Sequence, residues 1–419
     1  MEKKRILISY LYLLLYKIVI EFVYIYGISP TYSYSGLEIN MNFSKLFYSL
    51  LTLFILVLIL SKNTKNPSYY IYIILILFIF IPNSSYMWLN NQSINFFNYQ
   101  FISFLILGLL LNFTHKKITI TNYNARFILK LLFISYIIVT IIIVFIRGGI
   151  DNRALNFDSI YELRSENNIS GVLSYINNWV VKVLFPLFFS IFIYKKNFLL
   201  AFLVSILQVI MFLSFGNKAF LFSIGIILFL FYAVKTKFFI RTMSVFMSLL
   251  ILGSHFIRNI LDIDELFRAI PYRMIFIPAQ LQYQYYDYFS VREKIYFADG
   301  LIGKILSIQS PYPYGAPYMI STHYYDAFFS ANTGIFADAY TNGGVVYMII
   351  CTLILVLLLV FIDKISSSIP LSILIGSMGY MLFVINDTGL LTTLLTGGLL
   401  FQLLIFIVLN SAWNNYLDE

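Results

Sequence analysis

The sequence is poor in charge. Asp, Glu, Lys and Arg make up 11% of its 419 residues, whereas hydrophobic residues make up 60%. Soluble domains carry about 25% charged residues, so this composition excludes an ordinary soluble domain. Cysteine is nearly absent: the single Cys351 lies in an apolar run, which excludes an internal disulfide and a cysteine zinc site. The chain begins Met1-Glu2-Lys3-Lys4-Arg5 and shows no small-residue cleavage pattern, so we expect its first helix to be retained.

Twelve apolar runs are long enough, or nearly so, to cross a hydrocarbon layer about 30 Å thick as helices. The third and eighth are short, and no repeat relates the two halves of the chain. The sequence therefore predicts an all-α polytopic membrane protein of about 12 transmembrane helices, with residues 1–257, a large loop 258–335 and residues 336–419 as its parts. The predicted spans are 6–27, 43–61, 68–82, 98–114, 126–147, 172–194, 197–214, 219–234, 238–257, 336–362, 369–386 and 389–410.

Lysine and arginine are unevenly distributed between the two sides of this layout. Such a bias orients membrane proteins with the basic side inward, so we expect both termini to be cytoplasmic and the large loop to be external. The net charge of +9 then follows mostly from topology and does not argue for nucleic acid. The inner segments contain Lys3, Lys4, Arg5, Lys62, Lys65, Lys116, Lys117, Arg126, Lys195, Lys196, Lys235, Lys237, Arg241 and Lys364. The short outer segments contain Arg147, Arg153, Arg164 and Lys218.

Basic residues on the outer side are informative because the orientation rule disfavours them there. Four of them end or begin apolar runs or follow one closely: Arg147, Lys218, Arg258 and Arg273. Guanidinium groups bind phosphate oxygens through paired hydrogen bonds, so this set predicts a diphosphate site at the membrane surface. The alternative is that each residue caps a helix or pairs with an acid of the loop.

Proton acceptors and aromatic rings also occur in and beside the large loop. His323 is a candidate catalytic base because histidine accepts a proton near neutral pH, and Asp338 or Asp326 is the alternative. A surplus of tyrosines favours sugar binding by aromatic faces, although tyrosine also belongs at membrane interfaces for unrelated reasons. The tyrosines that we select as candidate sugar-binding residues are Tyr285, Tyr286, Tyr324 and Tyr340.

Three further features involve charged residues. Asp262 and Asp264 form a D-x-D pair of the kind that holds a divalent metal in some glycosyltransferases, but we favour simple charge balance with the preceding arginine. Lys17 and Glu21 are four residues apart on one helix and are expected to neutralise each other. Lys182 stands alone in mid-span, which indicates a bundle interior or a water-filled cavity and makes it a secondary site candidate.

Three stretches of the loop region and one turn form a recognisable pattern: Arg273-Met274-Ile275-Phe276-Ile277-Pro278-Ala279, Tyr285-Tyr286-Asp287-Tyr288-Phe289, the run from Ala331 to Gly344, and the turn Ser214-Phe215-Gly216-Asn217-Lys218-Ala219. They resemble a known family, the Wzy-type O-antigen and capsular oligosaccharide repeat-unit polymerases. The predicted topology, with about a dozen helices and one large external loop near two-thirds of the chain, is similar as well. Lys218 stands where many relatives have arginine, which weakens a bidentate role for it.

The resemblance implies a glycosyltransferase on the outer face of a bacterial inner membrane. Such an enzyme transfers a growing glycan from undecaprenyl diphosphate to the non-reducing end of another lipid-linked repeat unit, and a membrane chain-length regulator is a candidate partner. Arginines and Lys218 would stabilise the departing diphosphate, so the resemblance implies no metal and no cofactor. Two alternatives stay open. A lipid-linked oligosaccharide flippase shares the helices and the sugar cargo, and an O-antigen ligase differs in its acceptor.

Overall fold

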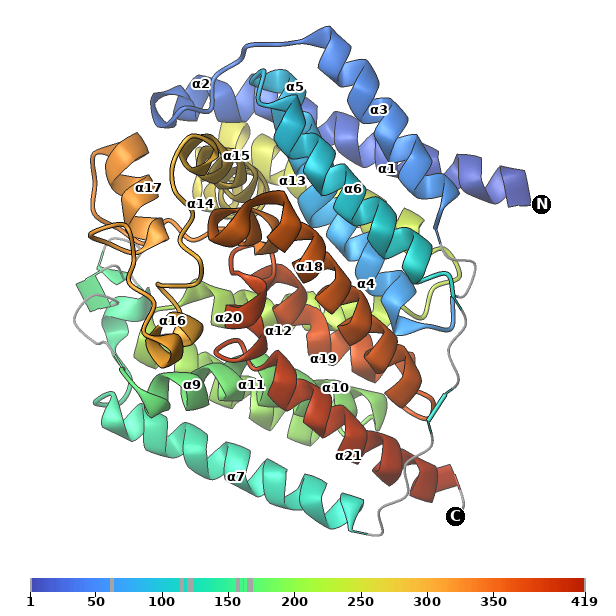
Figure 1. The fold of residues 1–419 in the computed structure, drawn as a ribbon. Coiled ribbons are helices and arrows are strands. Elements are labelled where there is room, and N and C mark those ends of the chain that lie inside the picture. The colour runs from blue at the N-terminus through green and yellow to red at the C-terminus, as the bar shows by residue number, and fades with distance from the viewer. Residues whose placement is uncertain are drawn as a thin grey trace.

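The computed structural model describes residues 2–60, 64–113, 117–118, 124–155, 159–160, 162–163 and 169–417. Lys62, Lys116 and Arg164, which entered the prediction of orientation, lie outside these residues. The regular structure of the described residues consists of helices, without strands (Figure 1). The two termini lie at one end of the bundle, and α16 (Leu301–Leu306) and α17 (Ala316–Tyr325) lie at the opposite end.

Seven helical runs in the described residues are long and apolar enough to cross a membrane. The predicted all-α class is confirmed for the described residues, and the length and composition of these runs support a multi-pass membrane protein. These runs are Lys3–Ser35, made of α1 (Glu2–Val23), η1 (Tyr24–Ile28), α2 (Ser29–Tyr32) and η2 (Ser33–Ser35); Pro67–Leu89, made of α4 (Pro67–Leu75), η3 (Ile76–Phe80) and α5 (Ile81–Leu89); α7 (Ala125–Ile146); Val172–Tyr194, made of α9 (Val172–Trp179), η5 (Val180–Leu184) and α10 (Phe185–Tyr194); α11 (Phe198–Phe215); α13 (Phe239–Leu261); and α18 (Ile335–Ile365).

Five shorter apolar helices complete the bundle of the described residues. Each of the twelve predicted spans overlaps either one of the seven long runs or one of these five. The shorter helices are α3 (Phe43–Leu58), α6 (Ile94–Leu110), α12 (Lys218–Ala233), α19 (Leu371–Val384) and α21 (Leu399–Leu417).

Prolines occur inside several of these runs without ending them. A proline lacks the N–H of a helical residue, and its ring collides with the carbonyl four residues earlier. A π-helical turn, which widens the hydrogen-bond ladder, comes directly before four such prolines: Pro30, Pro82, Pro186 and Pro278. For this reason the third run, predicted to stop at residue 82, continues as a helix to Leu89.

The segment predicted as a large loop contains a long helix that packs into the bundle. This helix is formed by α14 (Glu265–Phe267), η6 (Arg268–Phe276) and α15 (Ile277–Ser290). Gln282 is buried and accepts a hydrogen bond of 2.7 Å from Gln100 of α6, and the Tyr283 hydroxyl donates to the carbonyl of Asn83 in α5 at 3.2 Å. The helix from Glu265 to Ser290 is therefore part of the helix bundle.

Glycines break two helices at the end opposite the termini. In α18, Gly344 has φ +67° beside an extended Gly343, which frees the carbonyls of Thr341 and Asn342. The backbone N–H groups of Ile295 and Tyr296 donate to these two carbonyls at 3.0 and 3.2 Å. The break therefore separates the first turns of α18, up to residue 342, from the rest of the helix and anchors the segment after α15 there.

The last predicted span, 389–410, is not one helix in the structure. It divides into α20 (Leu390–Leu394) and α21. Gly398 lies between them with φ +89°, and a Cβ there would come within 2.7 Å of the Trp179 ring. The indole Nε1 of Trp179 donates to the Leu395 carbonyl at 3.2 Å. Close packing against α9 and a left-handed backbone together explain why the helix stops here.

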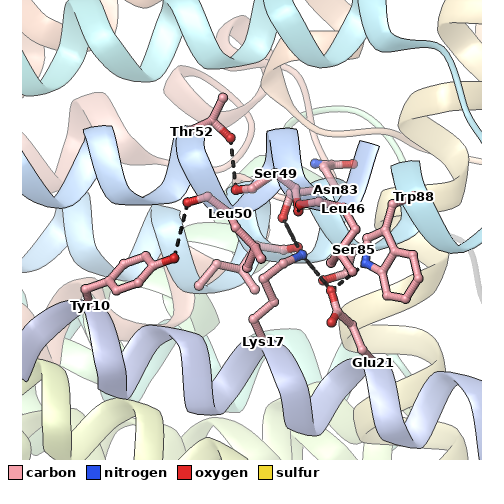
Figure 2. Close-up of polar contacts among 12 residues, drawn as sticks. Tyr10, Lys17, Glu21, Leu46, Ser49, Leu50, Thr52, Asn83, Ser85 and Trp88 are labelled. Atoms are coloured by element: carbon pink, nitrogen blue, oxygen red, sulfur yellow. Dashed lines mark hydrogen bonds and ion pairs between the residues drawn. The ribbon is translucent and has the colours of Figure 1, made fainter. Parts of the chain in front are cut away.

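A buried ion pair joins α1 to α5 (Figure 2). Lys17 is fully buried, and its ammonium lies 2.6 Å from the Glu21 carboxylate. Ser84 and Ser85 accept hydrogen bonds from Lys17, while Ser85 and the Trp88 indole donate to Glu21. The predicted neutralisation within one helix is confirmed, and the pair also links two helices.

Candidate functional site

A cavity of about 490 Å³ lies at the end of the bundle where α16 and α17 are found. Three carboxylates from separate parts of the chain line it: Asp299 before α16, Asp338 in the first turns of α18, and Asp387 between α19 and α20. The other polar lining residues include Tyr285 and Asn342. We call this space the carboxylate cavity. Such a lining is rich in hydrogen-bond acceptors and is suited to a ligand with many hydroxyl groups.

The break in α18 positions Asp338. The residue is on the short helical piece before Gly343 and Gly344, where the Asn342 amide donates to its backbone carbonyl at 2.9 Å. A Cβ built on Gly389 would come within 2.1 Å of an Asp338 carboxylate oxygen, so only glycine leaves room for the carboxylate in this position. Asp299 is held close by, because its carboxylate accepts a hydrogen bond of 2.7 Å from the Ala316 backbone N–H.

A second cavity, of about 330 Å³, contains two of the predicted phosphate ligands. Lys218 begins α12, and Arg273 belongs to η6, so residues 55 positions apart in sequence line one space. Asn217 caps α12 by accepting a hydrogen bond from the Ala219 N–H at 3.2 Å. We call this space the basic cavity. Two cationic side chains beside a helix N-terminus are an arrangement that favours an anion.

Asp387 lines both cavities. It follows the end of α19 in the sequence Asn386-Asp387-Thr388-Gly389, and its side chain is open to the cavity space. Enclosure by the protein raises the pKa of the Asp387 carboxyl to about 7, and the positive charge of Lys182 partly opposes this shift. Lys182, which stands alone in its predicted span, is therefore an electrostatic partner of Asp387.

Arg147 lies beside the turn that leads into α12. Its guanidinium donates to the Ser214 carbonyl at 3.2 Å and stacks on Phe215, 4.4 Å from the ring centroid. These contacts hold the end of α7 against the end of α11. Arg147 thus lies near the turn that contains Lys218. It does not line the basic cavity, however.

Arg258 occupies a different region from Lys218 and Arg273. It forms an ion pair with Asp264 at 3.0 Å and stacks on Phe267, with 4.6 Å from the guanidinium carbon to the ring centroid. Arg268 binds the other oxygen of Asp264 at 2.9 Å. The D-x-D pair thus contributes a carboxylate that balances two arginines, and Arg258 lines neither cavity.

His323 is exposed on α17 and lines neither cavity. Its ring packs at 5.1 Å from the Tyr288 ring and at 4.8 Å from the Tyr324 ring. Of the three predicted proton acceptors, His323, Asp326 and Asp338, only Asp338 lines one of these two cavities.

The four selected tyrosines also differ in position. Tyr285 lines the carboxylate cavity, and its hydroxyl donates to the Ala331 carbonyl at 2.7 Å. The rings of Tyr286 and Tyr340 pack against each other at 4.9 Å, and Lys294 lies 4.1 Å from the Tyr340 ring centroid. Tyr324 donates to Asp287 at 2.6 Å. Only Tyr285 is placed where it would meet a ligand in the carboxylate cavity.

Sequence reasoning missed Asp299 and Asp387. Asp299 lies in a loop of ordinary composition and carries no local signal. Asp387 belonged to a short polar interruption, residues 386–389, between two apolar runs, which is a signal of a cavity-lining or re-entrant position. No family model matches the chain, and searches of curated proteins and of solved structures found no match either.

Proposed function

We propose that this protein is a surface-polysaccharide polymerase, a glycosyltransferase that uses undecaprenyl-diphosphate-linked repeat units. All twelve apolar helices would cross a bacterial inner membrane, with both termini in the cytoplasm and the two cavities on the outer side. The location of both termini at one end of the bundle and of both cavities at the other supports this orientation.

The observation that carries the proposal is the juxtaposition of a basic and a carboxylate-lined cavity with one shared residue, Asp387. A transfer from a lipid diphosphate to a sugar hydroxyl needs a cationic surface for the leaving group and a polar surface for the acceptor. Lys218 and Arg273 would bind the diphosphate, and the carboxylate cavity would bind the acceptor glycan. The reacting atoms would then meet between the two cavities.

The positions of Lys218 and Arg273 are also suited to stabilising the leaving group. Negative charge builds up on the diphosphate as the glycosidic carbon departs, and fixed positive charges stabilise that transition state more than the ground state. Lys218 is a point charge and Arg273 a planar donor. We therefore assign bidentate binding to Arg273 and charge neutralisation to Lys218. Arg147 and Arg258 are assigned to packing, because neither lines a cavity.

The experiment is lipopolysaccharide banding in a strain that lacks this gene, complemented with wild type or with variants. A deletion strain with core carrying a single repeat, and a ladder restored by wild type, would support a polymerase. Loss of every repeat, including the first, would support the flippase or ligase instead. An Arg273→Ala variant is expected to lose the ladder.

Arg268→Ala is the matched control for Arg273→Ala because both arginines belong to η6. Arg268 pairs at the surface with Asp264 and lines neither cavity. Exposed ion pairs contribute only about 0–1 kcal/mol, so this variant should keep a normal ladder. Equal ladders from Arg273→Ala and Arg268→Ala would contradict the diphosphate assignment.

A further inference from the structure

Asp387 occupies a position that no other carboxylate of the described residues shares. Both cavities are lined by it, whereas Asp299 and Asp338 line the carboxylate cavity alone. In the proposed reaction the acceptor hydroxyl must approach the glycosidic carbon that is attached to the diphosphate. That contact occurs where the space for the acceptor meets the space for the diphosphate, and Asp387 is the acid at this junction.

The other two carboxylates of the cavity are held by protein contacts. Asp299 accepts the Ala316 N–H, and Asp338 is packed against Gly389, which leaves no room for a Cβ. They are placed to accept hydroxyl hydrogens from a bound sugar. Asp387 instead projects from a break between two helices, and its side chain is open to the cavity space.

Lys182 lies in η5, which packs against α19, the helix that ends just before Asp387, and its positive charge acts on the Asp387 carboxyl. It belongs to the π-turn η5, which comes directly before Pro186 in the next helix. A positive charge nearby keeps a carboxylate available in its ionised form despite enclosure by protein. The remaining charged groups that line the two cavities are Lys218, Arg273, Asp299, Lys304 and Asp338.

We propose that Asp387 is the general base of the transfer, with Lys182 as the positioning residue that maintains its charge. The inference rests on the proposed polymerase function and names a residue that the sequence did not single out. Asp387 is placed to contact the acceptor hydroxyl directly. Lys182 acts through Asp387 and is not assigned any contact with substrate.

The step balances in atoms and charge. The proton of the acceptor hydroxyl passes to a carboxylate oxygen of Asp387 while the hydroxyl oxygen bonds to the anomeric carbon of the donor glycan. The bond between that carbon and the diphosphate oxygen breaks, and its electron pair leaves with undecaprenyl diphosphate. Asp387 then returns the proton to water, which restores the carboxylate for the next transfer.

The test uses the full chain in the deletion strain, with the ladder of the wild-type gene as reference. General bases contribute about 10²–10⁴-fold to rate, so Asp387→Asn should reduce polymer by about 100-fold or more. Because that variant leaves Lys182 without its counter-charge, a Lys182→Met/Asp387→Asn double variant is made in parallel. If the two residues serve only to neutralise each other, the double variant should be active. If Asp387 is the base, the double variant should be as inactive as the Asp387→Asn single variant.

A binding measurement distinguishes a role of Asp387 as general base from a role in binding the diphosphate. Undecaprenyl diphosphate without sugar is added to each purified variant, and the rise in Tm is measured. Both Asp387 variants should keep the wild-type rise, because Lys218 and Arg273 are intact. Glu293→Gln, an exposed carboxylate outside both cavities, is the control and should keep ladder and binding.

Two results would overturn the assignment of Asp387. One is a normal ladder from the double variant, and the other is loss of the Tm rise together with the ladder. A deletion strain that keeps its ladder, or loses even the first repeat, would instead contradict the polymerase function itself. The two failures are read from different strains and are therefore distinguishable.

Discussion

Two pairs of ionisable residues lie in or beside apolar helices of this protein, and they differ in how completely the protein surrounds them. Lys17 and Glu21 are linked by a direct ion pair and by Ser84, Ser85 and Trp88, and Lys17 has no exposed surface (Figure 2). Lys182 and Asp387 act on each other electrostatically, but Asp387 lines two cavities.

The comparison separates a structural use of charge from a functional one. A buried charge costs free energy unless partners satisfy it, and a complete set of partners leaves nothing to bind a ligand. The α1–α5 pair has such a set and joins two helices. A charge that faces a cavity keeps part of its hydrogen-bonding capacity for whatever enters the cavity. In the sequence Lys17 and Glu21 are recognisable as a pair four residues apart on one helix, whereas nothing local connects Lys182 with Asp387.

The largest expected effect is on stability, at the enclosed pair. Glu21→Gln removes the counter-charge from fully buried Lys17, and breaking one side of a buried pair costs about 3–5 kcal/mol. We expect a marked fall in Tm in detergent micelles. The control is a Lys17→Met/Glu21→Gln double variant, which should regain most of the loss. Lys182→Met should lower the Tm much less, and an equal fall in Lys182→Met and Glu21→Gln would remove the distinction between the pairs.

An intermediate effect is expected in the pH dependence of polymer synthesis. Asp387 must be ionised to accept a proton, and its pKa is raised to about 7 by enclosure. The rate should therefore be highest above pH 7 and should fall about tenfold for each pH unit below it. Lys182→Met removes a positive charge that favours the ionised form, so its profile should shift to higher pH. Initial rates on the purified chain check this, and an unchanged profile in Lys182→Met would argue against the electrostatic link.

The smallest effect is expected at His323. This residue is exposed on α17 and lines neither cavity, although its chemistry made it the first candidate base. We expect His323→Ala to change the rate by less than about twofold, because His323 is not the proposed base. Removing a general base would instead lower the rate by about 10²-fold or more. A tenfold or greater loss, with the Tm unchanged, would return the catalytic role to His323 and would count against Asp387.

Proline and glycine show where sequence reasoning on the fold succeeded and where it stopped. Apolar runs located the seven long apolar runs of the described residues, because hydrophobicity and length are local properties. The less apolar helix from Glu265 to Ser290 was missed and lay in the segment predicted as a loop. The end of the third run was misplaced since a π-turn before Pro82 lets the helix continue to Leu89. The last run was predicted unbroken, although Gly398 stops the helix against Trp179.

The sequence predicted the types of residue in the candidate site better than it predicted which individual residues line the cavities. Of the predicted phosphate ligands, Lys218 and Arg273 line one cavity. Arg258 carried the same signal but pairs with Asp264. Nothing local distinguishes these arginines, because whether a guanidinium meets a carboxylate or a cavity depends on residues distant in the chain.

The sequence by itself determined the class of this protein, a multi-pass all-α membrane protein, and the regions where charge would matter. Composition suffices for this because a bilayer accepts only apolar helices of a certain length. Only the tertiary structure decided which charges are enclosed and which face a cavity. Asp387, Lys182 and Arg273 come from three separate elements of the fold. The packing of these elements places Asp387 and Arg273 in one cavity and brings Lys182 close enough to act on Asp387.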